Sequence, residues 1–288
     1  MEILDLLRES PGWLAATAAV FGLCVGSFLN VVIHRLPRMM EAQWRAECAA
    51  IEGREAPEAA PFNLVTPASR CPSCGTAIRA WQNIPLASWL ALRGRCAACR
   101  APISARYPAV ELAAGVLAAL LAWRYGFSAA LPLAAAYAWA LLALTFIDLD
   151  TQLLPDDITL PLLWLGLIAN AFGVFTDLRS AVLGAAGGYL ILWTVYWAFK
   201  LLAKKEGMGY GDFKLLAAIG AWAGWQALPV AILVGAGLGA VIGSIALWLS
   251  RKGADTRIPF GPYLALGGIV ALVWGHAAVV AWVGTFPR

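Results

Sequence analysis

Two aspartates lie at the edges of long apolar stretches. Asp148 directly follows the run LLALTFI, and Asp212 directly precedes FKLLAAIGAWAG within the segment GMGYGDFK (207–214). An ionisable side chain near membrane depth is costly, so it points to a functional site by default. Two carboxyl groups held close together cannot both ionise easily, and such a pair can activate water as a base while donating a proton as an acid. The residues therefore predict aspartyl protease chemistry with Asp148 and Asp212 as the catalytic pair.

Two glycines flank Tyr210, immediately before Asp212. Gly209 and Gly211 are expected to support the active site, because glycine lets the backbone bend and leaves room for a substrate backbone to approach. A structural interpretation of Asp212 stays open beside the catalytic one, since aspartate is a favoured helix N-cap and an apolar stretch starts directly after it.

Three more acids follow Asp148 in the segment FIDLDTQLLPDD (146–157). Asp150 is two residues away and competes with Asp148 for the catalytic role. The sequence LPDDITLP favours a turn followed by a helix, with Asp156 or Asp157 as the N-cap. We interpret all three as structural residues.

Four of the six cysteines form two pairs with metal-ligand spacing. The pattern is Cys71-x2-Cys74, then 21 residues, then Cys96-x2-Cys99, and each pair opens a similar unit, CPSCGTAI and CAACRAPI. Two such knuckles can place four thiolates around one Zn²⁺, as in a zinc ribbon, and four cysteines leave no open position for catalysis. The prediction is one structural zinc ion per chain; two disulfides or reduced structural thiols are the alternatives.

The composition is that of a membrane protein, with 61% hydrophobic and 13% charged residues. Soluble domains average about 45–50% apolar and about 25% charged residues. The net charge of +4 is small, and no basic stripe with interleaved aromatics is present, so we expect no nucleic-acid partner.

A membrane-spanning helix needs roughly 20 mostly apolar residues. We therefore expect an all-α polytopic membrane protein of about eight transmembrane helices, with a small zinc-ribbon-like cytoplasmic domain between the first and second. The expected spans, of which the sixth is short, are residues 13–35, 107–124, 128–147, 158–176, 180–200, 213–226, 228–249 and 260–284.

The basic residues predict the orientation of these spans. Loops on one side hold 17 of the 21 lysines and arginines, which makes that side cytoplasmic and places both termini on the outer side. The predicted domains are a first transmembrane helix (1–36), a cytoplasmic domain with the four-cysteine zinc site (37–105) and a seven-helix membrane aspartyl peptidase domain (106–288). The segment 41–63, at the start of the cytoplasmic domain, is expected to form a short charged helix and then a Pro/Ala linker.

Glycines recur every four residues in two of the apolar stretches. Gly235, Gly239 and Gly243 lie in VGAGLGAVIG (234–243), and Gly184 and Gly188 lie in an earlier span. We interpret them as small residues that let helices pack closely rather than as a cofactor-binding loop.

Five segments together resemble those of a known family. They are GSFLNVVIHRLP (26–37), the cysteine-rich stretch 71–112, FIDLDTQLLPD (146–156), GMGYGDFK (207–214) and PFGPYLALGG (259–268). In this order, over nearly the whole chain, they resemble the bacterial type IV prepilin peptidases, which are Gly-x-Gly-Asp intramembrane aspartyl proteases. The resemblance assigns the two catalytic aspartates to Asp148 and Asp212.

The resemblance also implies a function and a location. The family's enzymes lie in the inner membrane of bacteria and serve type IV pili and type II secretion. They cleave the basic leader of prepilins and pseudopilins after a glycine at the cytoplasmic membrane face, and then N-methylate the new N-terminal residue with S-adenosylmethionine. Methyl transfer rests on the resemblance alone, since no Gly-rich turn follows a predicted strand, and no residues are assigned to the methyl donor.

A proton-coupled transporter or channel is the main rival interpretation, with Asp148 and Asp212 as relay groups. Such a protein would place its carboxylates near mid-span and pair discontinuous helices. Here the acids lie at span ends and no repeat of the two halves is visible. A zinc-stabilised membrane scaffold without chemistry is a second rival.

Overall fold

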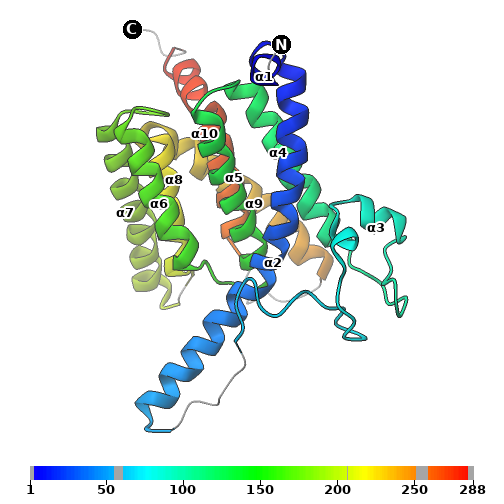
Figure 1. The fold of residues 1–288 in the computed structure, drawn as a ribbon. Helices are drawn as coiled ribbons and strands as arrows, with labels where there is room; N and C mark the ends of the chain where they lie inside the picture. The colour runs from blue at the N-terminus through cyan, green and yellow to red at the C-terminus, as the bar shows by residue number, and fades with distance from the viewer. Residues whose placement is uncertain (1–2, 55–60, 206, 251–258, 285–288) are drawn as a thin grey trace. The chain divides into compact units, whose positions relative to one another are not determined.

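The structure is a computed structural model that describes residues 3–54, 61–205, 207–250 and 259–284, and within these ranges helices joined by loops make up the fold (Figure 1). The α-helices are α1 (Ile3–Glu9), α2 (Pro11–Ile51), α3 (Ala87–Ala91), α4 (Arg106–Tyr125), α5 (Ala130–Thr151), α6 (Asp156–Ala171), α7 (Leu178–Ala203), α8 (Tyr210–Ala223), α9 (Leu228–Ser250) and α10 (Gly261–Gly284), with 3-10 turns η1 (Ala80–Asn83) and η2 (Trp225–Ala227).

The predicted all-α membrane class is confirmed. Each of the eight expected spans falls on its own helix, from α2 and α4 to α10. Within the described residues, five helical segments are long and apolar enough to cross a membrane, namely α2, α4, α5, α7 and Trp225–Ile245. α6 and α8 are shorter, at 16 and 14 residues.

The first long helix differs from the prediction. α2 has 41 residues, which is about 60 Å and about twice the hydrocarbon thickness of a bilayer. The expected separate charged helix is therefore wrong, because the helix passes through Pro37 without ending and continues to Ile51. Its last turns contain no glycine, and i,i+4 pairs such as Gln43 with Glu47 (2.9 Å) stabilise them. Residues 55–60 of the expected linker lie outside the described residues.

The chain divides into two compact units, residues 1–127 and 128–288. In the first unit, α2 and α4 pack with their backbones in close contact. A Cβ added at Gly22 would lie 2.6 Å from the carbonyl oxygen of Ala114, and one added at Gly26 would lie 2.6 Å from Cα of Glu111. α4 was predicted as part of the peptidase domain, and the domain limits at residues 36 and 105 stay predictions.

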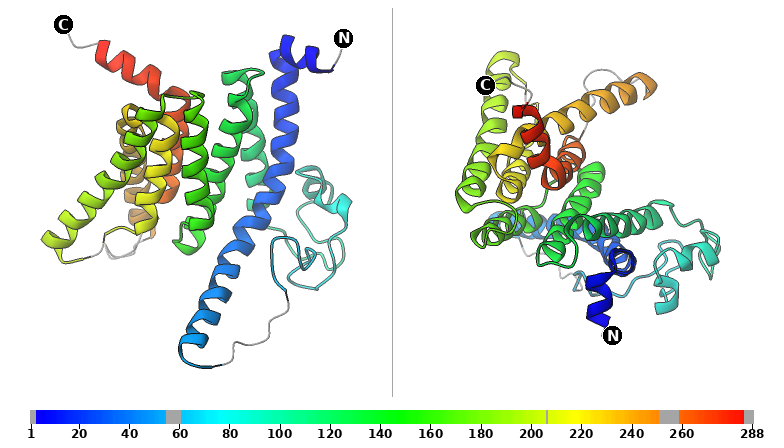
Figure 2. Two further views of the ribbon diagram at one scale, coloured as in Figure 1. Left: turned by 60° about the vertical axis from the view of Figure 1, so that its left-hand side comes forward. Right: turned by 90° about the horizontal axis from the view of Figure 1, so that it is seen from above.

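The second unit consists of α5 to α10, drawn in green to red in Figure 2. Its core is formed by large buried side chains, including Tyr137, Phe213 and Trp222. The predicted close packing at Gly184 is confirmed, because an added Cβ would lie 2.3 Å from the carbonyl oxygen of Gly220 on α8. This packing leaves α8 almost wholly buried, and α8 carries Asp212.

Candidate active site and metal centre

Asp148 lies in the final turn of α5, three residues before its last residue, Thr151, and is 5% exposed. Its carboxylate oxygen Oδ2 accepts a hydrogen bond of 3.0 Å from the backbone N–H of Gly261, the first residue of α10. An amide at the start of a helix has no partner within that helix, so it is free to hold an acid. The bond joins residues 113 positions apart and fixes the direction of the Asp148 side chain.

Asp212 lies in the first turn of α8 and is 7% exposed. The N-cap of this helix is Gly209, so the capping role considered for Asp212 is wrong. The apolar run starts at Phe213, but the helix starts three residues earlier, because Tyr210 and Gly211 already have helical geometry. A carboxylate in the first turn is nevertheless favoured by the helix dipole.

The structure brings the two aspartates together in the second unit. They lie close enough for the charge of one carboxyl group to affect the other. Leu154, from the segment between α5 and α6, packs against the glycines beside the two acids. A Cβ added at Gly211, next to Asp212, would lie 2.8 Å from its Cβ, and one added at Gly261, which bonds to Asp148, would lie 3.2 Å from its Cδ2. A pair of buried acids next to an apolar side chain is suited to general acid–base chemistry on a bond shielded from bulk water.

The two predicted support glycines differ in their surroundings. Gly211 is needed for packing, because the space beside it is filled by Leu154. Gly209 has φ −84° and ψ 152°, a backbone geometry that any residue adopts, and an added Cβ would meet nothing closer than 3.9 Å. The bend expected at Gly209 therefore does not require glycine.

The other acids have different surroundings. Asp150 is exposed, whereas Asp148 two residues earlier is buried. Asp156 and Asp157 lie in the first turn of α6, whose N-cap is Pro155, so the prediction that one of them is the cap is wrong. Asp156 instead pairs through both carboxylate oxygens with Nζ of Lys214 on α8, at 2.8 and 2.6 Å. This ion pair links the starts of α6 and α8.

Two residues beside the aspartates were not singled out from the sequence. Gly261 lies in the segment PFGPYLALGG, which carried part of the resemblance, so a signal for it was present. Leu154 gave no signal, because a leucine beside an apolar stretch is ordinary. Only the folded chain places it against Gly211 and Gly261.

The four predicted zinc ligands come together in the first unit. Their sulfur atoms all lie within 4.8 Å of one another, and Sγ of Cys71 is 3.8 Å from Sγ of Cys99. Four sulfurs at about 2.3 Å from a tetrahedral Zn²⁺ are about 3.8 Å apart, so the cluster has the right size for this ion. All six cysteines are free thiols, and the disulfide alternative is not found.

The two knuckles have the same backbone structure, shifted by 25 positions. An antiparallel bridge closes each one, between Arg70 and Ala77 and between Arg95 and Pro102. A residue with positive φ follows the second cysteine of each pair, Gly75 at 70° and Arg100 at 60°. These turns direct both sulfur atoms of a pair toward the same cluster. The Cys-x2-Cys spacing alone could therefore predict the site.

The thiol of Cys74 ionises more readily than that of an ordinary cysteine. It lies 3.3 Å from Oγ1 of Thr76, and hydrogen bonds from this residue's side chain and backbone lower the pKa of Cys74 to about 6. The thiolate is the form that binds metal, so a lowered pKa favours ligation at neutral pH.

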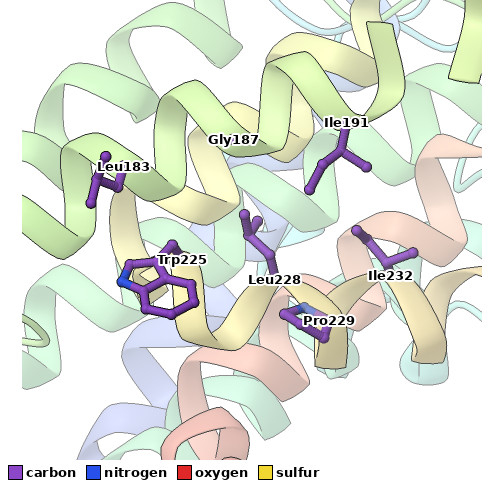
Figure 3. Close-up of a pocket in the computed structure, with 7 residues that line it drawn as sticks. All are labelled: Leu183, Gly187, Ile191, Trp225, Leu228, Pro229 and Ile232. Carbon is purple, nitrogen blue, oxygen red and sulfur yellow. The ribbon is translucent and has the colours of Figure 1, made fainter. Parts of the chain in front are cut away.

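A separate pocket of about 490 Å³ lies between α7, η2 and α9 (Figure 3). Its lining is apolar and contains neither an acid nor a cysteine; it consists of Leu183, Gly187, Ile191, Trp225, Leu228, Pro229 and Ile232. The pocket therefore offers no group for acid–base chemistry or metal binding.

Two family models match the chain, one in each half. Residues 20–125 match the bacterial peptidase A24 N-terminal domain, and residues 135–244 match the type IV leader peptidase family, a family of proteases. No solved structure matches the chain.

Curated relatives named prepilin leader peptidase/N-methyltransferase match over nearly their full length. The protein of Stutzerimonas stutzeri is 54% identical, covering 98% of both chains, and that of Pseudomonas aeruginosa is 54% identical, covering 96% of this chain and 95% of its own. The relative from Aeromonas hydrophila is 53% identical, covering 97% of both chains. The resemblance noted in the sequence is thereby confirmed, and the chain belongs to the type IV leader peptidase family.

Proposed function

We propose that the chain is a bifunctional prepilin leader peptidase and N-methyltransferase. It cleaves the basic leader of type IV prepilins and pseudopilins after a glycine, and then methylates the amino group that cleavage exposes. The names of relatives that are 54% identical over nearly the whole chain support both activities. The substrates would serve type IV pili and type II secretion.

The observation that carries the peptidase half is the buried pair of Asp148 and Asp212. In the proposed mechanism, one carboxylate takes a proton from water, whose oxygen attacks the carbonyl carbon of the scissile bond. The other acid, protonated, donates to the carbonyl oxygen, and a proton then passes to the leaving amine. The Gly261 amide holds Asp148 in place during these transfers.

The zinc site has a structural role in this proposal. One Zn²⁺ held by Cys71, Cys74, Cys96 and Cys99 would stabilise a segment whose described helices are very short, of four and five residues. A domain of this size commonly needs such a metal. With four thiolates bound the ion has no open position, so no step of cleavage is assigned to it.

The methyl donor is S-adenosylmethionine, which supplies an activated methyl group on a sulfonium when bound. The acceptor is the α-amino group of the cleaved substrate, and it must lose a proton to act as a nucleophile.

The proposed location is the bacterial inner membrane, in contact with lipid, with both termini periplasmic and the cysteine-rich segment cytoplasmic. The distribution of Lys and Arg supports this orientation. Asp148 near the end of α5 and Asp212 at the start of α8 would then lie at the cytoplasmic membrane face, where the charged leader of a substrate stays. The same placement at helix ends, rather than mid-helix, speaks against a proton-coupled transporter.

Mass spectrometry of a prepilin co-expressed with the chain tests both activities at once. The expected product begins immediately after the leader's last glycine and is heavier by one methyl group. An unprocessed prepilin beside stably expressed protein would contradict the proposal. A cleaved product without the methyl group would contradict its second half.

A further inference from the structure

Glu111 on α4 is a buried acid that the proposed cleavage mechanism does not use. It is 9% exposed. Helix α2 lies directly against it, since a Cβ added at Gly26 would be 2.6 Å from Cα of Glu111. The backbone on which this carboxylate stands is therefore held in place by tight helix packing.

One carboxylate oxygen of Glu111 accepts a hydrogen bond from a strained turn at Leu86. Oε2 accepts a 2.8 Å hydrogen bond from the backbone N–H of Leu86, whose φ of 58° and ψ of −49° are rare for a residue with a side chain. The N–H of Ala87 bonds to the carbonyl oxygen of Pro85 at 2.6 Å and closes a three-residue turn. A γ-turn with positive φ is strained, and strain of this kind concentrates at ligand-binding and catalytic sites.

The hydrogen bond from Leu86 does not explain why residue 111 carries a charge. A glutamine would accept the same bond without the cost of burying a carboxylate. Among the residues that the structure describes, no hydrogen bond reaches Oε1, and no lysine, arginine or histidine forms an ion pair with Glu111. Oε1 is not among the fully buried atoms that lack a partner, so a ligand can reach it. A largely buried carboxylate with one accessible oxygen and no cation of its own is suited to a cationic ligand.

We propose that Glu111 binds a cationic reactant of methyl transfer through Oε1. The inference rests on the proposed function, which supplies two such cations: the α-ammonium group of the cleaved substrate and the sulfonium of S-adenosylmethionine. Both are compact positive groups that a single carboxylate oxygen can hold by charge. Glu111 thereby becomes a binding residue for the half of the reaction to which no residue has been assigned.

The variant Glu111→Gln separates the charge from the hydrogen bond, because the amide oxygen still accepts from Leu86 N–H. We expect cleavage and zinc content to stay at the wild-type level, while methylation of a pre-cleaved peptide falls by about tenfold or more, the effect of one lost charged contact. Two binding measurements on detergent-purified protein identify the cation. A weakened Kd for S-adenosylmethionine assigns the sulfonium, and a raised KM for the peptide at unchanged Kd assigns the ammonium.

Glu47→Gln is the matched control, since Glu47 is an exposed acid on α2 that bonds to Gln43. It should leave every readout unchanged. Glu111→Gln protein that methylates and binds both reactants like wild type would overturn the inference, as would a parallel loss of methylation, cleavage and zinc, which marks a purely structural residue. If wild-type protein itself fails to methylate, the proposed function is wrong, an outcome distinct from a failure confined to Glu111.

Discussion

Gly261 donates its backbone N–H to Oδ2 of Asp148 at 3.0 Å, and a Cβ on Gly261 would lie 2.6 Å from the same oxygen. Gly261 thus provides the hydrogen bond and, because it has no side chain, also leaves the space that the Asp148 carboxylate occupies. Through it, the start of α10 sets the position of an acid at the end of α5. Cleavage should therefore depend on a residue far from Asp148 in sequence.

The variant Gly261→Ala is expected to reduce cleavage by about a hundredfold, because the methyl group displaces the Asp148 carboxylate and misplacement of a catalytic group by about 1 Å has this effect. The loss should appear in kcat, with methylation of a pre-cleaved peptide retained. Prepilin cleavage and peptide methylation assays on the same preparation measure both. Gly237→Ala is the control, since nothing lies within 4 Å of a Cβ at that position. Wild-type cleavage by Gly261→Ala would show that the contact does not matter.

Gly209 and Gly211 provide a matched pair of substitutions. Gly211→Ala places a Cβ 2.8 Å from Cβ of Leu154 and should push the start of α8, with Asp212, away from Asp148. Gly209→Ala meets no close atom and keeps an ordinary backbone geometry. We expect cleavage to fall strongly in the first variant and little in the second, as initial rates on one prepilin would measure. Equal rates for the two variants would contradict the packing role of Gly211.

The ion pair of Asp156 with Lys214 should contribute little. Its side chains are 50% and 33% exposed, and ion pairs this accessible to solvent are worth about 0–1 kcal/mol. Asp156→Asn should therefore lower the free energy of unfolding by less than about 1 kcal/mol and leave cleavage active. Thermal unfolding in detergent and a cleavage assay check this. A variant that is folded but inactive would contradict this prediction and show that cleavage requires Asp156.

Metal content tests the cysteine cluster. Fresh protein should contain about one zinc ion per chain, and Cys71→Ser with Cys74→Ser should lose it, because the remaining two thiolates do not complete the tetrahedral shell. Elemental analysis of purified protein measures both. Limited proteolysis should then cut the cysteine-rich segment faster, since metal binding and folding are coupled in small metal domains. Wild-type protein without bound metal would remove this site from the account.

The sequence predicted best where a local pattern decides the structure. The spacing of Cys71, Cys74, Cys96 and Cys99 is enough to predict a cluster, because each knuckle folds through its own short-range turns. Apolar runs placed the helices, but not the end of α2, where helix-forming residues continue past Pro37.

Local sequence patterns could not predict contacts between segments that are far apart in the sequence. The bond from Gly261 to Asp148 and the packing of Leu154 depend on how α5, α8 and α10 assemble, which no spacing in the sequence encodes. The cap positions failed for a local reason. Pro155 and Gly209, which precede the acids, are the N-cap residues of α6 and α8. Asp156 and Asp212 therefore lie inside the first turn of each helix.

The most direct test of the account is the cleavage rate of one prepilin by Asp148→Asn, Asp212→Asn and Asp150→Asn in detergent. Asn keeps the shape of each acid but cannot exchange the proton. We predict that the first two variants lose at least about a thousandfold in kcat, the scale of general acid–base catalysis, while methylation of a pre-cleaved peptide persists. Asp150→Asn, at an exposed position, should cleave at close to the wild-type rate. Substantial cleavage by either Asp148→Asn or Asp212→Asn would contradict the aspartate pair.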